Sequence, residues 1–130
     1  MSLSAGDAIE LKVTPDPYVT YRYAGASGDF NPIHLDEAFA TQVGLPGRIL
    51  HGLWTMAQVA RALTEASGGP ETLNSLKVEF RGMGRLDEEI VVRGQVAEDG
   101  PTAGPLRVEL VAVQAGKRII RNAVATVTPD

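Results

Sequence analysis

The sequence predicts an α+β fold in which an antiparallel sheet wraps around one long buried helix. Its middle part holds a helical segment, Gly52 to Gly69, that is apolar on nearly every side. After that segment the spacing of apolar residues changes from about 3.6 to about 2, the change expected between helix and strand. The chain has 130 residues, of which 44% are hydrophobic, and this is enough apolar surface for one core. We therefore expect a single domain over residues 1–130.

The first element is a predicted strand from Ala8 to Asp16. Apolar and polar residues alternate along it, and Pro15 and Pro17 end the pattern because proline cannot continue a strand ladder. The next segment, Tyr18 to Ala26, has an aromatic spacing that suits a short helix and extended chain equally well. The sequence leaves both alternatives open for this segment.

A short helix is predicted from His34 to Val43. Its apolar side chains recur at four-residue steps and so lie on one face: Leu35, Phe39 and Val43. Pro32 suits the first turn of this helix, and Gly44 suits its end. Acidic residues near the start favour the same assignment, because the helix dipole stabilises anions there.

The helix from Gly52 to Gly69 is the strongest local prediction. Its apolar residues are Leu53, Trp54, Met56, Ala57, Val59, Ala60, Leu63 and Ala66. They point to nearly every side of a helix, which predicts that the whole helix is buried. Two glycines and Pro70 end it.

Four strands are predicted to follow and to form an antiparallel meander. They are Leu73–Gly82, Glu88–Asp99, Pro105–Gln114 and Gly116–Pro129. Glycines interrupt the pattern between them, at Gly82, Gly84, Gly100, Gly104 and Gly116. The last two strands are separated by the sequence QAGK, which is typical of a tight hairpin.

Composition excludes several classes of function. The net charge of −4 and the lack of a basic cluster argue against nucleic acid, and no apolar stretch is long enough to cross a membrane. We therefore expect a soluble, cytoplasmic protein. The absence of cysteine excludes disulfides, thiol nucleophiles and thiolate metal sites. His34 and His51 are the only histidines, so a zinc site would need carboxylate ligands as well, and we expect no metal ion.

The stretch YAGASGDFNPIHLDEAF, residues 23–39, places Asp29 and His34 close together, where helix-breaking residues meet the start of a predicted helix. The structural interpretation is that Asp29 caps a turn and His34 is a surface histidine, and spacing alone slightly favours it. In the functional interpretation the carboxylate and the imidazole face one cavity and share a water molecule as base and acid. Asn31 could then orient either group, and Pro32 would stiffen the turn.

A second candidate is ILHGLWTM, residues 49–56, at the start of the long helix. The unpaired amides of a first helical turn point at whatever lies in front of them, and Gly52 would let a ligand approach the backbone closely. Such an amide could stabilise the enolate-like charge on a thioester carbonyl. Tight helix packing is the alternative for Gly52. For His51 we favour a structural, hydrogen-bonded histidine.

These residues together resemble the hydratase motif of the MaoC-like family, which includes (R)-specific enoyl-CoA hydratases and 3-hydroxyacyl-thioester dehydratases. The resemblance is carried by Tyr23-Ala24, Ser27-Gly28-Asp29, Asn31-Pro32-Ile33-His34, Asp36, Phe39-Ala40, Gly44 and His51-Gly52. It is densest from Tyr23 to Met56. The helix and meander downstream resemble the hot-dog fold of that family.

The resemblance implies a hydro-lyase that reversibly adds water to a trans-2-enoyl thioester of coenzyme A or acyl carrier protein, giving the (R)-3-hydroxyacyl thioester. In this assignment Asp29 and His34 are the catalytic pair, and the amide of Gly52 contacts the thioester carbonyl. Asn31 and Ser27 match orienting residues. The resemblance implies no cofactor. It implies a homodimer, although HGLWTM is also similar to dehydratases whose active subunit pairs with a different chain.

Two features depart from the family pattern. Trp54 stands where smaller apolar residues are common; facing the tunnel, its indole would bind and limit the acyl chain, whereas facing the sheet it would be ordinary core. The segment RGMGRLDEE, residues 81–89, lacks the usual proline and Gly-Asp. Its arginines and Arg93 could bind coenzyme A phosphates, but solvated arginines are commoner. A non-catalytic acyl-thioester-binding subunit and a hot-dog thioesterase remain as alternative functions.

Overall fold

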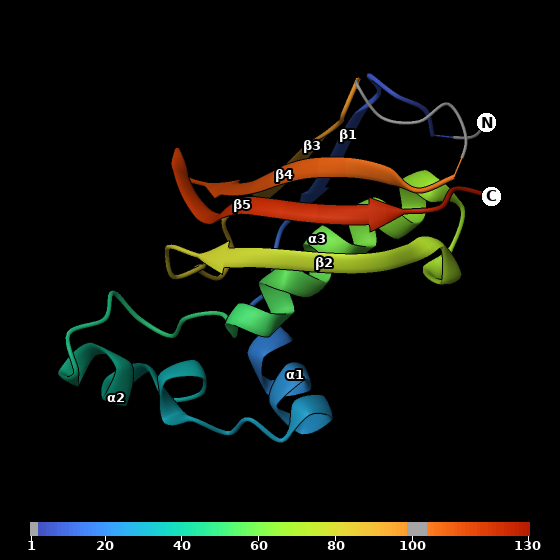
Figure 1. The fold of residues 1–130 in the computed structure, drawn as a ribbon. Coiled ribbons are helices and arrows are strands. Elements are labelled where there is room, and N and C mark those ends of the chain that lie inside the picture. Colours follow the sequence, from blue (N-terminus) through green and yellow to red (C-terminus); the bar gives the residue numbers. More distant parts are fainter. Residues whose placement is uncertain (1–2, 99–103) are drawn as a thin grey trace.

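The computed structural model describes residues 3–98 and 104–130, and it contains one five-stranded antiparallel sheet in the order β1-β3-β4-β5-β2 (Figure 1). The strands are β1 (Ala8–Val13), β2 (Leu73–Phe80), β3 (Ile90–Val96), β4 (Leu106–Gln114) and β5 (Lys117–Val127). The helices are α1 (Val19–Ser27), α2 (Glu37–Gln42) and α3 (Gly52–Ser67), with short 3₁₀ turns at Pro32–His34 and Pro70–Thr72. This confirms the predicted α+β class.

Helix α3 lies across one face of the sheet, and α1 and α2 gather at the end where α3 begins (Figure 1). The core is built between α3 and the sheet. Its fully buried members include Val59 and Leu63 from the helix, and Ile90, Val108 and Ile120 from the strands. No helix in the described ranges is long and apolar enough to cross a bilayer.

The expectation that α3 is buried on every side is wrong for the single chain. The side facing the sheet is buried, as the predicted α+β layering requires, and it carries Thr55, Val59 and Leu63. On the opposite side Leu53 is 61% exposed and Ala57 is also exposed.

The region before α3 differs from prediction in two places. The segment Tyr18 to Ala26, left open by the sequence, is mostly helical: α1 runs over Val19–Ser27 and is followed by Gly28 with a left-handed φ of 79°. The helix predicted from His34 begins only at Glu37, because the Asp36 carboxylate caps it by accepting a hydrogen bond from the amide of Phe39 at 3.1 Å. Of the apolar face predicted for it, Phe39 is 37% and Val43 55% exposed, whereas Ala40 is the residue of α2 that is buried.

The four predicted strands after α3 are confirmed, with shorter ends. The predicted four-strand meander is wrong, because β2 pairs with β5 at the edge of the sheet and only β3, β4 and β5 follow one another as neighbours. Asp99 and Gly100, placed at the end of a strand and in its connection, lie outside the described residues. The predicted hairpin is confirmed: Ala115 and Gly116 have φ of 50° and 76°, the left-handed pair that a two-residue loop requires.

Candidate active site

Three hydrogen bonds hold the turn after α1. In each of them a polar side chain of the turn accepts from a backbone amide two residues away. The amide of Asp29 donates to the Ser27 hydroxyl at 3.1 Å, and the amide of Asn31 donates to Oδ1 of Asp29 at 3.2 Å. The side-chain oxygen of Asn31 accepts from the amide of Ile33 at 3.1 Å and so caps the following 3₁₀ turn. Asn31 therefore contacts the Asp29 carboxylate through its backbone amide, while its side-chain oxygen is occupied by the cap.

His34 is buried, and one of its ring nitrogens is occupied. Its Nδ1 lies 2.8 Å from the carbonyl oxygen of Ile49. A carbonyl can only accept, so Nδ1 carries a proton, and in the neutral ring Nε2 then keeps a lone pair. Nε2 lies 3.8 Å from Oδ2 of Asp29, whose side chain is 52% exposed. This separation is too long for a direct hydrogen bond and short enough for one water molecule to contact both atoms.

His51 packs directly against this pair. Its ring stacks on His34 with centroids 3.9 Å apart and an interplanar angle of 21°. The edge-to-face contact with Tyr23 has centroids 4.8 Å apart. Its Nε2 lies 3.0 Å from the backbone oxygen of Asp29, whereas its Nδ1 is buried without a partner among the described residues. The predicted hydrogen bond of His51 is present, and it joins the ring to the candidate site.

Asp29, His34 and His51 offer potential metal-ligand atoms that lie within 4.8 Å of one another. The two imidazole rings are nearly parallel, so their in-plane lone pairs run side by side. They cannot converge on one ion at the Zn–N distance of about 2.0–2.1 Å. The arrangement suits proton transfer better than metal binding.

The N-terminus of α3 lies beside His34. The carbonyl of His51 accepts from the amides of Trp54 and Thr55, at 3.1 and 3.3 Å. The amides of Gly52 and Leu53 have no acceptor within residues 3–98 and 104–130, as expected for a first helical turn. A Cβ at position 52 would lie 3.3 Å from the Phe80 ring, so only glycine leaves the space in front of these amides open.

One cavity of about 190 Å³ joins the two candidates. Its lining residues are His34, Ile49, Leu50, Gly52, Thr55, Phe80, Gly82, Met83, Gly84, Ile119 and Ile120. Phe80 and Met83 are 49% and 50% exposed, so they form an apolar rim. Thr55 is buried, and its hydroxyl has no hydrogen-bond partner in the part of the chain that the structure describes. The cavity thus combines apolar walls, an imidazole and free amides.

Sequence reasoning missed the far wall of this cavity. The wall is built by the segment that departs from the family pattern, together with β5. Gly84 is buried and accepts a 2.9 Å hydrogen bond from the amide of Leu50, and a Cβ there would lie 2.7 Å from Cδ1 of Leu50. The pair of glycines around Met83 was the available signal, since glycine marks close backbone approach.

The remaining predicted residues lie away from this cavity. Trp54 is half-buried and packs against the core cluster, and it does not line the cavity. Arg81 and Arg85 are exposed. Arg93 pairs with Glu10 at 3.4 Å on the face of the sheet turned away from α3.

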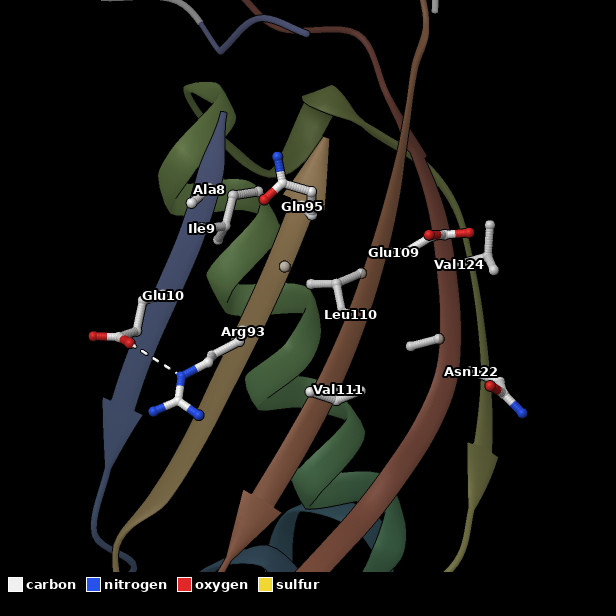
Figure 2. Close-up of a pocket in the computed structure, with 12 residues that line it drawn as sticks. Ala8, Ile9, Glu10, Arg93, Gln95, Glu109, Leu110, Val111, Asn122 and Val124 are labelled. Atoms are coloured by element: carbon white, nitrogen blue, oxygen red, sulfur yellow. Dashed lines mark hydrogen bonds and ion pairs between the residues drawn. The ribbon is translucent and has the colours of Figure 1, made fainter. Parts of the chain in front are cut away.

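That outer face carries a larger hollow, of about 600 Å³, across strands β1, β3, β4 and β5 (Figure 2). Polar side chains border it, including Glu10, Arg93, Gln95 and Glu109. No histidine lines this hollow, and the Glu10–Arg93 contact is an exposed ion pair. The size of this hollow does not by itself indicate a reaction, so the smaller cavity beside His34 is the candidate active site.

The comparisons with known proteins point to the same family. The family model described as "MaoC like domain" matches residues 5–124. Over 74 residues the chain is 42% identical to fatty acid synthase subunit beta of Aspergillus oryzae, a match covering 55% of this chain and 4% of that protein. Over 77 residues it is 36% identical to 3-hydroxybutyryl-CoA dehydratase of Methylorubrum extorquens, covering 58% and 49%. Each match thus spans half or less of the relative's length.

Solved structures confirm the hot-dog fold. R-hydratase PhaJ1 from Pseudomonas aeruginosa superposes with a TM-score of 0.86 at 25% identity, covering 98% of this chain and 83% of that one. The ChsH1–ChsH2 complex from Mycobacterium tuberculosis contains a chain that superposes with a TM-score of 0.84 at 21% identity, covering all of both chains. The second likeness supports the fold alone.

Proposed function

The chain belongs to the MaoC-like hydratase and dehydratase family, and on that premise we propose that it is a hydro-lyase acting on trans-2-enoyl thioesters. It adds water reversibly and gives the (R)-3-hydroxyacyl thioester. The observation that carries the proposal is the pairing of Asp29 and His34 at 3.8 Å, beside a cavity that His34 and Gly52 both line. Relatives named as dehydratases and an R-hydratase of the same fold support it.

In the proposed reaction one water molecule lies between the Asp29 carboxylate and Nε2 of His34. One of these groups takes a proton from the water as its oxygen attacks C3 of the enoyl group. A proton is then delivered to C2, so the elements of water are added across the double bond. The charge that develops on the thioester oxygen is enolate-like, and the free amide of Gly52 at the N-terminus of α3 stabilises it.

Ser27 and Asn31 are proposed to orient the catalytic carboxylate. Both act near the Asp29 backbone and Oδ1 through the hydrogen bonds of the turn. Oδ2 is then left for the water. Because the turn holds the Asp29 carboxylate in place before the substrate binds, it lowers the entropic part of the activation barrier.

The proposed substrate carries a short acyl group. The cavity of about 190 Å³ is smaller than the ~300 Å³ at the low end of ordinary ligand pockets, and its walls are mainly apolar. Trp54 packs against the core outside this cavity, so we propose it as a second limit only for acyl groups that extend past the cavity. The carrier is coenzyme A or acyl carrier protein, and the net charge of −4 gives no reason to invoke nucleic acid.

The proposed partner is a second copy of this chain, with a related but different subunit as the alternative. Strand β2 is an edge of the sheet, so one side of its backbone is open. Large apolar side chains are exposed close to that edge and to α3: Phe30, Leu53, Phe80 and Met83. A dimer that covers them would close the cavity to water.

The proposal is tested by mixing the purified chain with crotonyl-CoA and following the loss of enoyl-thioester absorbance, with a free-thiol assay alongside. Loss of absorbance without thiol release supports hydration, whereas thiol release would instead indicate a thioesterase. An (R)-specific 3-hydroxyacyl-CoA dehydrogenase added in a coupled assay reads the stereochemistry. No reaction from the chain alone, and reaction only with a partner subunit, would favour the non-catalytic alternative.

A further inference from the structure

His51 makes contacts that its place in the sequence does not require. It is the N-cap residue of α3, yet its side chain does not cap the helix. Instead Nε2 reaches the backbone oxygen of Asp29, 22 residues earlier in the chain, at 3.0 Å. The residue is only 2% exposed, and its Nδ1 is buried without a partner in the described ranges. An unpaired buried nitrogen is unfavourable for folding, which points to a role besides stability.

The two histidines are held as opposite tautomers. The Asp29 carbonyl can only accept, so His51 carries its proton on Nε2, whereas His34 carries its proton on Nδ1. Each ring is thus tied to a backbone oxygen by one nitrogen. The unprotonated nitrogen of His34 is the one that lies near the Asp29 carboxylate.

The stacking contact with His51 restrains the orientation of the His34 ring. The His51 ring lies flat on one face of His34, with centroids 3.9 Å apart, and Tyr23 packs edge-on against His51. A ring covered on its face cannot rotate without breaking the contact. His51 therefore restrains both partners of the pair: the Asp29 backbone by a hydrogen bond and the His34 ring by stacking.

We propose that His51 is a positioning residue, which holds the Asp29 carboxylate and the His34 imidazole at the separation that one shared water molecule requires. This inference rests on the proposed hydratase function. His51 takes no part in bond making. Its effect is to keep a near-attack arrangement, in which displacements of about 1 Å are costly.

Three variants separate the two contacts. His51→Phe keeps a stacking ring and loses the hydrogen bond, His51→Gln keeps a donor and loses the stack, and His51→Ala loses both. With crotonyl-CoA we expect kcat to fall about 10-fold in each of the first two and about 100-fold in the third, with KM changed by less than about threefold. Ser67→Ala, a buried polar change at the other end of the same helix, is the control for lost stability.

A kcat that stays within about twofold of wild type in His51→Ala would overturn the proposal. A rise in KM at unchanged kcat would also overturn it, because His51 would then contact substrate instead. A fall in kcat that Ser67→Ala reproduces at equal loss of thermal stability would reduce His51 to a structural residue.

A second measurement does not depend on activity. The sequence has two histidines, so ¹⁵N-labelled imidazole resonances can be assigned with one variant. We expect His34 as the Nδ1–H tautomer and His51 as the Nε2–H tautomer, with His34 becoming a tautomer mixture in His51→Ala. Unchanged His34 resonances in that variant would contradict the proposal. An inactive wild-type chain with these resonances as expected would overturn the hydratase function, and with it the catalytic purpose of the positioning, while the restraint of His34 by His51 would remain as a structural contact.

Discussion

Nε2 of His34 and Oδ2 of Asp29 lie 3.8 Å apart, with Nδ1 of His34 held by the Ile49 carbonyl and the carboxylate half exposed. A water molecule placed about 2.8 Å from each atom fits this separation. Both atoms can accept a hydrogen bond from the same water molecule, and either one can take a proton from it. At this distance they do not form a direct hydrogen bond with each other. This separation suits one shared water molecule better than a direct hydrogen bond between the two side chains.

The first prediction concerns this pair. Asp29→Asn and His34→Ala should each lower turnover of crotonyl-CoA by at least about 100-fold, because each removes one acid-base group. Thermal unfolding should change little for Asp29→Asn, since the carboxylate is exposed. Asp36→Asn is the matched control: it changes an acid in the same region that caps α2, and it should keep activity. Near wild-type turnover in either site variant would remove the assignment.

The second prediction concerns Gly52. A methyl group there would meet the Phe80 ring at 3.3 Å, a contact that a small shift of the ring relieves. Gly52→Ala should therefore fold, helped by the higher helix propensity of alanine. Turnover should fall at least about 10-fold, because the methyl group occupies space in front of the amide.

Gly25→Ala provides the control for that change. Gly25 lies in helix α1, and a Cβ there would meet nothing within 4 Å. The substitution repeats the chemical change of Gly52→Ala on another helix, and it should raise thermal stability slightly without affecting turnover. Full activity in Gly52→Ala would show that the space before α3 is not used by substrate.

The third prediction concerns acyl chain length. Wild type should prefer crotonyl-CoA to octenoyl-CoA because the cavity is small and bounded by Met83. Met83→Ala should raise the octenoyl-to-crotonyl ratio of kcat/KM by at least about threefold, as one wall is shortened. We expect the same direction from Trp54→Leu. An unchanged ratio in Trp54→Leu would assign the indole to the core alone.

How far the sequence could predict this site depends on how local each part is. Asp29 and His34 lie five residues apart on one turn, so spacing and turn chemistry were enough to bring them together. The cavity wall made by Gly84, Ile119 and Ile120 depends on two long-range contacts: the pairing of β2 with β5, and the contact of Leu50 with residues 81–89. No local sequence pattern predicts either contact. Sequence reasoning also expected α3 to be buried all round, because apolar pattern cannot distinguish a core contact from an interface.

The fourth prediction concerns stability at the cavity wall. Gly84 is buried, and a Cβ there would lie 2.7 Å from Cδ1 of Leu50, closer than real contacts allow. Gly84→Ala should therefore destabilise the fold by about 1–3 kcal/mol, the range for an overpacked core. Gly25→Ala, at a position with open space around it, separates this steric effect from loss of glycine itself. A thermal midpoint for Gly84→Ala equal to wild type would mean that Leu50 can move freely.

The last prediction concerns the exposed apolar surface near the site. Leu53 is 61% exposed at the start of α3, and Phe30 is 62% exposed on the turn that carries Asp29. Side chains of this size in water are unfavourable, and a dimer would bury them. We expect sedimentation equilibrium to give twice the mass of the chain. Leu53→Lys should shift the protein toward monomer without unfolding it, because the side chain is already outside the core.

Turnover should fall with the loss of the dimer, since the opened cavity admits water around the enolate. Val124→Lys introduces the same charge at an apolar residue that is 37% exposed on the outer face of β5, and it should leave mass and turnover unchanged. A wild-type chain that is monomeric and fully active would contradict the dimer. A monomeric chain that gains activity with a second subunit would instead place that subunit over Leu53 and Phe30.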